Sequence, residues 1–464
     1  MSSRRELHLL RREGLAPWAL VALTLLLVGA ALNGRALLGV QARTAAGLEE
    51  EAAQTTRALG EQAARGIATA TSPGVVGYSV LGEPAVLPPT PLGALAIGQG
   101  DLLPAWYPVT ARGPYNFLVR SEPENPLRLS IGNFDAAFVI VWLLPLVVIA
   151  LSFNVVSAER ERGVLAIAVA SGSSPAAFIF GKIVARALVV FGSLWIALFA
   201  AALAAGVPLA RAAGALPWLL WLAAATLYGA FWFALALFVN SRPRASDQNA
   251  SLLAGAWLVL VILLPSLTNL AATTVFAAPS RVALTTELRE ASEAADRAAA
   301  ATRDKYFFDH PEMQGGDLDR TAYFQSVAQS ELDISKAMAP LLAQFDVQAR
   351  KQQGLVEVLQ FLSPGTMTWQ ALTALAGSDG ARHREFRAQT LTFHDRWSGF
   401  FRERLMRSAT LTAADYAALP QFRFDEPALG RTLARALPAL AALLALSLLL
   451  GGIAMRRLRR FPVV

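Results

Sequence analysis

The sequence contains no cysteine and only four histidines among its 464 residues. The missing cysteines exclude disulfide bridges, thiolate metal sites, iron–sulfur clusters and cysteine nucleophiles. The histidines are scattered, at His8, His310, His383 and His394, so we predict no metal site. Charge is also scarce, because Asp, Glu, Lys and Arg make up 16% of the chain against about 25% in soluble domains. A purely soluble enzyme is therefore not expected.

Long apolar runs take the place of the missing charge. Hydrophobic residues make up 55% of the chain, and a bilayer core requires roughly 20 apolar residues in a helix. Six apolar windows of this length occur, at 17–39, 136–157, 183–206, 216–239, 250–275 and 433–454. The first could also be a signal peptide, but it runs on to Val40 without a clear cleavage site, which favours an uncleaved anchor. We predict an all-α membrane protein with six transmembrane helices.

The net charge of +7 is distributed unevenly. The basic residues that flank the windows all fall on one side of a six-span protein: Arg4, Arg5, Arg11, Arg12, Arg160, Arg162, Lys182, Arg242, Arg244, Arg456, Arg457, Arg459 and Arg460. Basic flanks resist translocation, so this side is expected to be the cytoplasm, with both termini there. The basic surplus then records orientation in a bilayer, and no nucleic-acid partner is expected.

Two long segments, 40–135 and 277–431, are expected on the opposite side as extracytoplasmic domains. They separate the first span with the N-terminus (1–39), spans two to five (136–276), and the sixth span with the basic tail (432–464). Ten of the 25 prolines lie between residues 73 and 126, which favours short strands, such as 75–81 or 115–119, over long helices. The second and larger segment lacks such breakers over long stretches and is predicted to be mostly helical, at about 282–305, 319–354 and 380–407.

The segment between the second and third windows carries the clearest local signal. It reads Glu159, Arg160, Glu161, Arg162 and Gly163, followed by an apolar run to residue 170 and a new helix start at Ser174-Pro175. Charges often mark a membrane boundary, but the positive-inside bias alone does not explain paired glutamates. We expect a short cytoplasmic helix between two membrane helices, placed to transmit a push from a soluble partner.

This stretch resembles the Glu-basic-Glu-x-Gly-Thr signature of permease subunits of type 2 ATP-binding-cassette transporters, with Val164 in place of the threonine. Gly181-Lys182 and Asn240-Ser241-Arg242 also look like that family. Further stretches resemble a bacterial subgroup whose outer domain has no known function: Leu362-Ser363-Pro364, Leu375 to Asp379, Arg382 to Phe386, Trp397, Phe400-Phe401 and Leu419-Pro420-x-Phe422.

The resemblance implies a permease subunit of an ATP-driven exporter in the bacterial inner membrane. It implies cytoplasmic cassette ATPase subunits, which would bind ATP and magnesium, and a second permease, either another copy or a paralogue. Periplasmic or outer-membrane components are further candidate partners. The chain itself has no Gly-x4-Gly-Lys-Ser/Thr motif, since Ile183 follows Gly181-Lys182, so we expect neither ATPase activity nor a cofactor in this chain. The resemblance assigns the coupling role to residues 159–163.

Prolines and asparagines inside two spans are candidates for the substrate pathway. Pro145 and Pro265 are expected to bend the second and fifth spans and to free carbonyls that need partners in the bundle. Asn154 and Asn269 are costly in lipid, although ordinary interhelical hydrogen bonding would explain them equally well. In the resembled family these two spans line the path at the dimer seam.

Two alternatives stay open at this point. His383, with Arg384 and Glu385, could form an acid–base site, but a solvated helix face is the favoured interpretation. The whole chain could also be a membrane-anchored sensor or scaffold that recruits periplasmic partners without transport. The alternating charges and the prolines in the spans favour movement, which a scaffold does not need.

Overall fold

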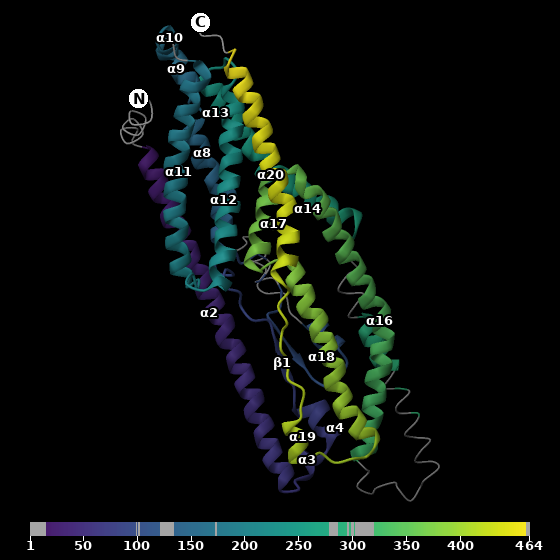
Figure 1. Cartoon of the computed structure of the whole chain (residues 1–464). Helices are drawn as coiled ribbons and strands as arrows, with labels where there is room; N and C mark the ends of the chain where they lie inside the picture. The colour runs from purple at the N-terminus through teal and green to yellow at the C-terminus, as the bar shows by residue number, and fades with distance from the viewer. Residues whose placement is uncertain are drawn as a thin grey trace, which may run out of the picture.

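The computed structural model describes residues 15–98, 100, 103–120, 134–171, 174–277, 286–294, 297, 301 and 320–460. The molecule is long and mostly helical, with a helix bundle at one end and a second body at the other (Figure 1). Within these described residues, six helices are long and apolar enough to cross a membrane: Pro17–Ala64, Ala136–Glu161, Pro175–Ala205, Gly214–Asn240, Ser246–Val275 and Leu429–Leu458. The six predicted windows are confirmed as helices of membrane-spanning length. The basic N-terminal residues lie outside the described part.

The six long helices are built as follows. Span 1 is α2 (Leu15–Ala64), and span 2 is α7 (Ala136–Phe138), η2 (Val139–Leu143), α8 (Leu144–Ser152) and α9 (Ser157–Glu161). After the short α10 (Val164–Ala170), span 3 is α11 (Pro175–Ala205), span 4 is α12 (Ala212–Asn240), and span 5 is α13 (Ser246–Trp257), η3 (Leu258–Leu263) and α14 (Leu264–Val275). Span 6 is α20 (Leu429–Leu458). The start of α2, the end of α20, α9 and α10 all lie at one end of the molecule, here called the α9–α10 end (Figure 1).

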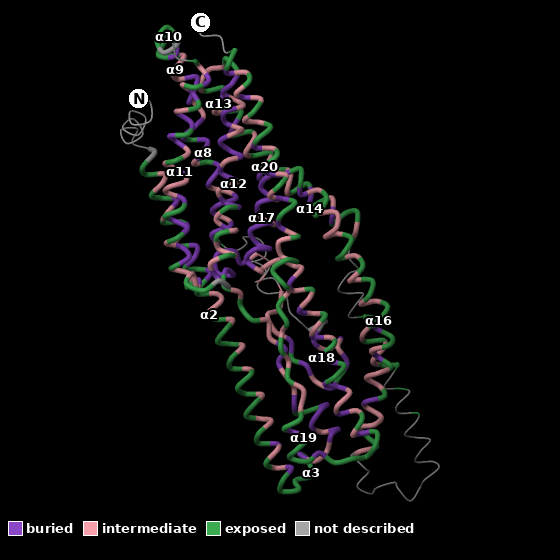
Figure 2. Tube along the Cα trace, in the orientation of Figure 1, coloured by how far each residue is buried: buried purple, intermediate pink, exposed green. Residues whose placement is uncertain are grey.

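The bundle has a large apolar core along its inner faces and a smaller one at the α9–α10 end (Figure 2). A helix from the predicted second outer segment, α17 (Pro364–Ala376), belongs to the large core. Met367, Ala371, Leu372 and Leu375 of α17 are buried with side chains of the spans. Ser363 begins α17 by accepting a hydrogen bond from the Thr366 amide, and the apolar sequence after it suits burial. By its packing, α17 is part of the bundle.

The second body, here called the distal body, combines chain from both predicted outer segments. It contains the far half of α2, α3 (Ala68–Thr71), α4 (Pro73–Val75), η1 (Val76–Val80), β1 (Glu83–Val86), β2 (Trp106–Val109), α5 (Tyr115–Arg120), α16 (Arg320–Leu359), η5 (Gln360–Leu362), α18 (Gly380–Met406) and α19 (Ala413–Ala417). One hydrophobic core joins them: Tyr107 stacks on Phe386 at 5.5 Å between ring centroids, and Phe117 lies in the same core. The two segments therefore pack as one body.

The predicted strands at 75–81 and 115–119 were wrong. Ser72 accepts a hydrogen bond from the Val75 amide and Pro73 follows it, so a helical turn starts here, and the Leu81 amide bonds to the Val76 carbonyl. Residues 115–120 form α5. The hairpin instead pairs β1 and β2 antiparallel, with Glu83 opposite Val109.

The long helices predicted in the second outer segment agree with the structure where it describes them. The helix predicted at 380–407 is confirmed as α18, and the one at 319–354 is confirmed as α16, which continues through Pro340 to Leu359. Of the helix predicted at 282–305, residues 286–294 are helical, and most of the others lie outside the described residues.

Candidate functional site

Gly163 makes the turn between α9 and α10. Its φ of +70° lies in the left-handed region, and its amide donates to the Arg160 carbonyl at 3.0 Å. A Cβ at this position would meet no atom within 4 Å, so the requirement for glycine is conformational rather than steric. The predicted short helix after the charged stretch is confirmed as α10.

Glu159 forms a largely buried ion pair with Lys182 of span 3. The Lys182 Nζ lies 2.6 Å from Oε1 of Glu159, and the two side chains are 6% and 12% exposed. A buried charge is stable only beside an opposite charge, so this ion pair holds α9 against α11. Sequence reasoning placed Lys182 among the boundary charges and missed this partnership.

The next two residues bind the start of span 5. The Arg160 guanidinium donates to the Arg244 carbonyl at 3.1 Å. The Glu161 carboxylate accepts from the Ser246 amide at 2.9 Å and from its hydroxyl at 3.0 Å, at the N-terminus of α13. A carboxylate there also interacts favourably with the helix dipole. The side chain of Arg162 is exposed.

A layer of amides joins spans 2, 4 and 5 beside these charges. Asn240, the last residue of α12, is buried and donates to the Ser152 carbonyl at 3.2 Å. Its Oδ1 accepts from Asn249 of α13 at 3.2 Å. Together with the three charged contacts, this layer connects α9 and the end of span 2 to spans 3, 4 and 5.

Asn154 belongs to the same end of the molecule. Its Oδ1 accepts from Arg186 of α11 at 3.3 Å, and Arg186 also donates to the Leu151 carbonyl at the end of α8. Arg186 is buried and was not among the predicted site residues. The signal for it was Lys182 and Arg186 four residues apart, which places both on one face of a helix.

Pro145 and Pro265 occupy equivalent positions in spans 2 and 5. In each span a wide helical turn, η2 or η3, ends just before the proline, where the Leu144 and Leu264 amides bond to carbonyls five residues earlier. A proline lacks the amide that would continue the ladder, and such wide turns are a recognised cause of bends.

The freed carbonyls have partners, as predicted. The Val141 carbonyl accepts from the Tyr228 hydroxyl at 2.9 Å, and the Trp142 carbonyl accepts from the Trp257 indole at 3.1 Å. The Leu260 carbonyl accepts from the Ser363 hydroxyl. The bends in spans 2 and 5 are therefore held by spans 4 and 5 and by the start of α17.

Asn269 lies one helical turn after Pro265, on the open face of span 5. Asn269 and its neighbours Ser266 and Leu270 are exposed, whereas Pro145 is buried in the core. Span 5 has the least covered apolar window of the six, with 11% of it buried. The described part of the chain leaves this face of the bundle uncovered.

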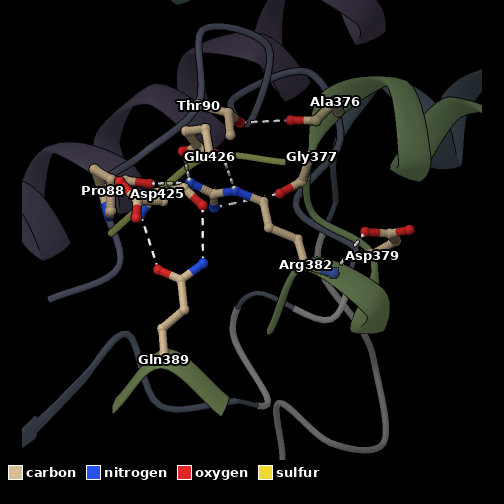
Figure 3. A network of polar contacts seen from close by, with 9 residues as sticks. All are labelled: Pro88, Thr90, Ala376, Gly377, Asp379, Arg382, Gln389, Asp425 and Glu426. Carbon is tan, nitrogen blue, oxygen red and sulfur yellow. Dashed lines mark hydrogen bonds and ion pairs between the residues drawn. The ribbon is translucent and has the colours of Figure 1, made fainter. Parts of the chain in front are cut away.

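A second polar cluster lies where α17 turns into α18 (Figure 3). The buried Arg382 guanidinium donates to the Glu426 carboxylate and to the Pro88 and Gly377 carbonyls. Asp379 caps α18 through the Arg382 amide and lies 3.1 Å from Arg435 Nε of span 6. The cluster ties α18 to the 87–90 segment and to the start of α20.

The predicted solvated face at His383 was wrong. His383 is partly buried, packs beside Tyr107 and Phe386, and its Nε2 lies 3.1 Å from the Pro104 carbonyl. A carbonyl can only accept, so Nε2 carries the proton. Burial lowers the pKa of His383 to about 4, which keeps the ring neutral. Among the residues that the structure describes, no group of three His, Asp or Glu side chains could hold a metal ion.

The comparisons with known proteins give one match. A family model described as a domain of unknown function (DUF3526) matches residues 281–425, which include α16, α17, α18 and α19. No curated protein and no solved structure matches the chain. The matched residues therefore contribute helices to both the distal body and the bundle. The description of the family assigns no activity to them.

Proposed function

We propose that this chain is a permease subunit of an ATP-driven transporter of the type 2 cassette class, in a bacterial inner membrane. The observation that carries the proposal is the attachment of α9, through Glu159 and Glu161, to spans 3 and 5 at the end of the bundle where α2 begins and α20 ends. A partner that pushes on α9 and α10 would act on several spans at once.

The partner in this proposal is a cytoplasmic cassette ATPase, which holds ATP and magnesium. The short helix α10 presents apolar side chains to the surroundings, with Ile167 70% exposed and Val164 exposed beside it. Such side chains at the tip of a bundle suit docking in a groove of a soluble subunit. Closure of the ATPase would displace α10, and the turn at Gly163 would transmit the displacement to α9.

The movement would reach span 5 through Glu161 and Ser246, and the wide turns before Pro145 and Pro265 would allow the two spans to change their bend. The open face of span 5 would pack against a second permease, another copy or a paralogue. An exposed amide such as Asn269 is costly in lipid, and a partner chain would compensate it. Cargo would then pass along this seam, outward if the transporter is an exporter.

The test is the Glu161→Gln variant, which weakens the contact with Ser246 without emptying a buried site. In proteoliposomes that contain the permease and its ATPase, we expect transport and cargo-stimulated ATP hydrolysis to fall at least fivefold, with unchanged membrane insertion. Glu51→Gln is the matched control, because it removes the same charge from an exposed residue of α2 that lies outside the coupling stretch. Equal activity of Glu161→Gln and the unmodified chain would exclude the coupling role of Glu161.

A second candidate function is a membrane-anchored scaffold that recruits partners without transport. The shared core of the distal body, which joins the α2 extension to α18, gives this candidate a rigid platform. Affinity purification from native membranes separates the two. Recovery of a cassette ATPase supports the transporter, whereas recovery of envelope proteins with no ATPase supports the scaffold.

A further inference from the structure

An open cavity lies where the bundle meets the distal body. Its empty space, part of which is open to solvent, is about 590 Å³. One wall is α2, with Leu38 and Gln41. The opposite wall is the α17–α18 turn, and described residues of 87–97, Gly100 and 103–105 complete the lining. Leu38 lies at the end of the first predicted span, and Asp379 of the turn contacts Arg435 near the start of span 6, so the cavity lies level with the ends of two spans.

The lining is apolar, and its charges are compensated internally. Leucine, isoleucine and proline side chains form most of the surface: Leu38, Leu87, Pro88, Pro89, Ile97, Leu103 and Pro104. Arg382 is paired with Glu426, and Asp379 with Arg435. Arg382 and Asp379 are the charged residues of the lining that the structure describes, and both are paired, so a charged ligand would lose its hydration without finding a free counter-charge among them. The cavity therefore suits a neutral ligand with an apolar body.

Two side chains of the lining, Gln41 and His383, offer acceptor atoms. The Gln41 amide nitrogen donates to the Gly100 carbonyl at 3.3 Å, which leaves its Oε1 as an acceptor. His383 donates through Nε2 to Pro104, which leaves Nδ1 as the acceptor of the ring. A hydroxyl group can donate to either atom, whereas a carboxylate or phosphate cannot.

We propose that this cavity binds a neutral amphiphile, with its aliphatic chain against Leu38, Leu103 and the proline wall and its hydroxyl group at Gln41 and His383. The site is independent of the α9–α10 end. An apolar pocket with a few convergent polar groups is the usual form of a small-molecule site. The position level with the span ends allows such a molecule to enter from the surface of the bilayer.

Because the chain has no cysteine, a single introduced cysteine is the one thiol that a maleimide can modify, and its reaction rate can be measured directly. The Leu103→Cys chain in phosphatidylcholine nanodiscs is treated with a water-soluble maleimide, with and without 1-hexadecanol. We expect hexadecanol to slow the reaction at least fivefold. The control is Gly47→Cys on the exposed part of α2, where a Cβ meets nothing within 4 Å and no protection is expected.

Two comparisons make the test specific. Palmitate at pH 8, which has the same chain length but a carboxylate head, should protect at least threefold less, and Gln41→Leu should reduce protection by hexadecanol to the level of palmitate. Ala105→Phe, which fills the cavity and keeps the backbone bond between its carbonyl and Leu87, should abolish protection. Gly93→Leu, whose Cβ would lie 3.1 Å from Leu38 Cδ1, is a second filling variant.

Several results would overturn the proposal: no reaction of Leu103→Cys without alcohol, no protection by hexadecanol, equal protection by palmitate, or protection that persists in both filling variants. A further arm, which rests on the proposed function, adds the ATPase and ATP to the hexadecanol-loaded nanodiscs. Release of protection would identify the amphiphile as cargo, and unchanged protection would identify it as a resident lipid. Binding in the absence of ATPase supports the site in either case.

Discussion

At the α9–α10 end, an ion pair and amide contacts join the helices beside a small apolar cluster around Leu165, whereas stacked and edge-on aromatic rings hold the distal body together. The first contacts are few and directional: Glu159 with Lys182, Glu161 with Ser246, and Asn240 with Asn249. The second are many and depend on close packing, as around Phe386. A directional contact can break and re-form as a unit, whereas a packed core resists small displacements. The directional contacts are therefore the part of the α9–α10 end that is suited to rearrangement, whereas the aromatic core suits a rigid distal body.

The largest effect is expected from breaking the aromatic core. Phe386→Ala removes a fully buried ring that contacts Tyr107, Phe422 and Phe424, and core deletions of this size cost about 3–5 kcal/mol. Thermal unfolding of the full chain in nanodiscs measures the loss. Met406→Ala at the exposed end of the same helix should change stability by less than about 0.5 kcal/mol. Similar losses in both variants would contradict a packed core here.

Glu159→Ala should cost slightly less, about 3 kcal/mol, because it removes the carboxylate that compensates the buried Lys182 ammonium. The double variant Glu159→Ala with Lys182→Met should regain most of this loss, since no buried charge then lacks its counter-charge. Chemical unfolding of the single and double variants measures the coupling between the two residues. A double variant no more stable than the single one would show that the ion pair is not the source of the loss.

Replacing glycine by alanine should have opposite effects on stability in the turn at Gly163 and in a regular helix. Gly163→Ala places a side chain at a φ of +70° and should destabilise by about 1–2 kcal/mol. Gly47→Ala, within exposed α2, should stabilise by about 0.4–1 kcal/mol, because alanine restricts the unfolded chain. The sign of the two shifts in unfolding midpoint is the measurement. Equal signs would refute the conformational role of Gly163.

The smallest effect is a pH dependence confined to the distal body. Since the folded pKa of His383 is about 4 and the unfolded value is near 6.5, the unfolded chain binds the extra proton between these values. Stability should therefore fall as the pH drops through this window, by about 1 kcal/mol at pH 5.5. The unfolding midpoint at pH 7.5 and 5.5 measures it. His383→Gln, with no group to titrate, should show a smaller difference between the two pH values.

Local features of the chain could be predicted because their physical causes are local. Ser174 begins α11 as expected, with its hydroxyl accepting from the Ala177 amide, and α18 begins and ends close to its predicted bounds. The carbonyls near Pro145 and Pro265 have partners because a missing amide always leaves one free. The strand predicted at 75–81 failed because a capped turn at Ser72 outweighs the glycines and prolines that suggested extended chain.

Contacts between distant parts of the chain could not be predicted. Arg382 donates to a carbonyl 294 residues away in the sequence, and no pattern around Pro88 announces it. His383 was expected on a solvated face because its neighbours Arg384 and Glu385 are charged. Successive side chains of a helix point in different directions, and the His383 ring points toward Tyr107 whereas the side chains of Arg384 and Glu385 do not.

What the sequence by itself determined is the number and position of the apolar helices of membrane-spanning length and the position of the charged turn at residues 159–163. Apolar burial is proportional to area and needs only composition and run length. What only the tertiary structure decided is that Lys182 and Arg186 are buried with partners, that both outer segments share one core, and that α17 joins the bundle. These depend on which surfaces meet, and two side chains compensate each other only after the whole chain has brought them within a few ångströms.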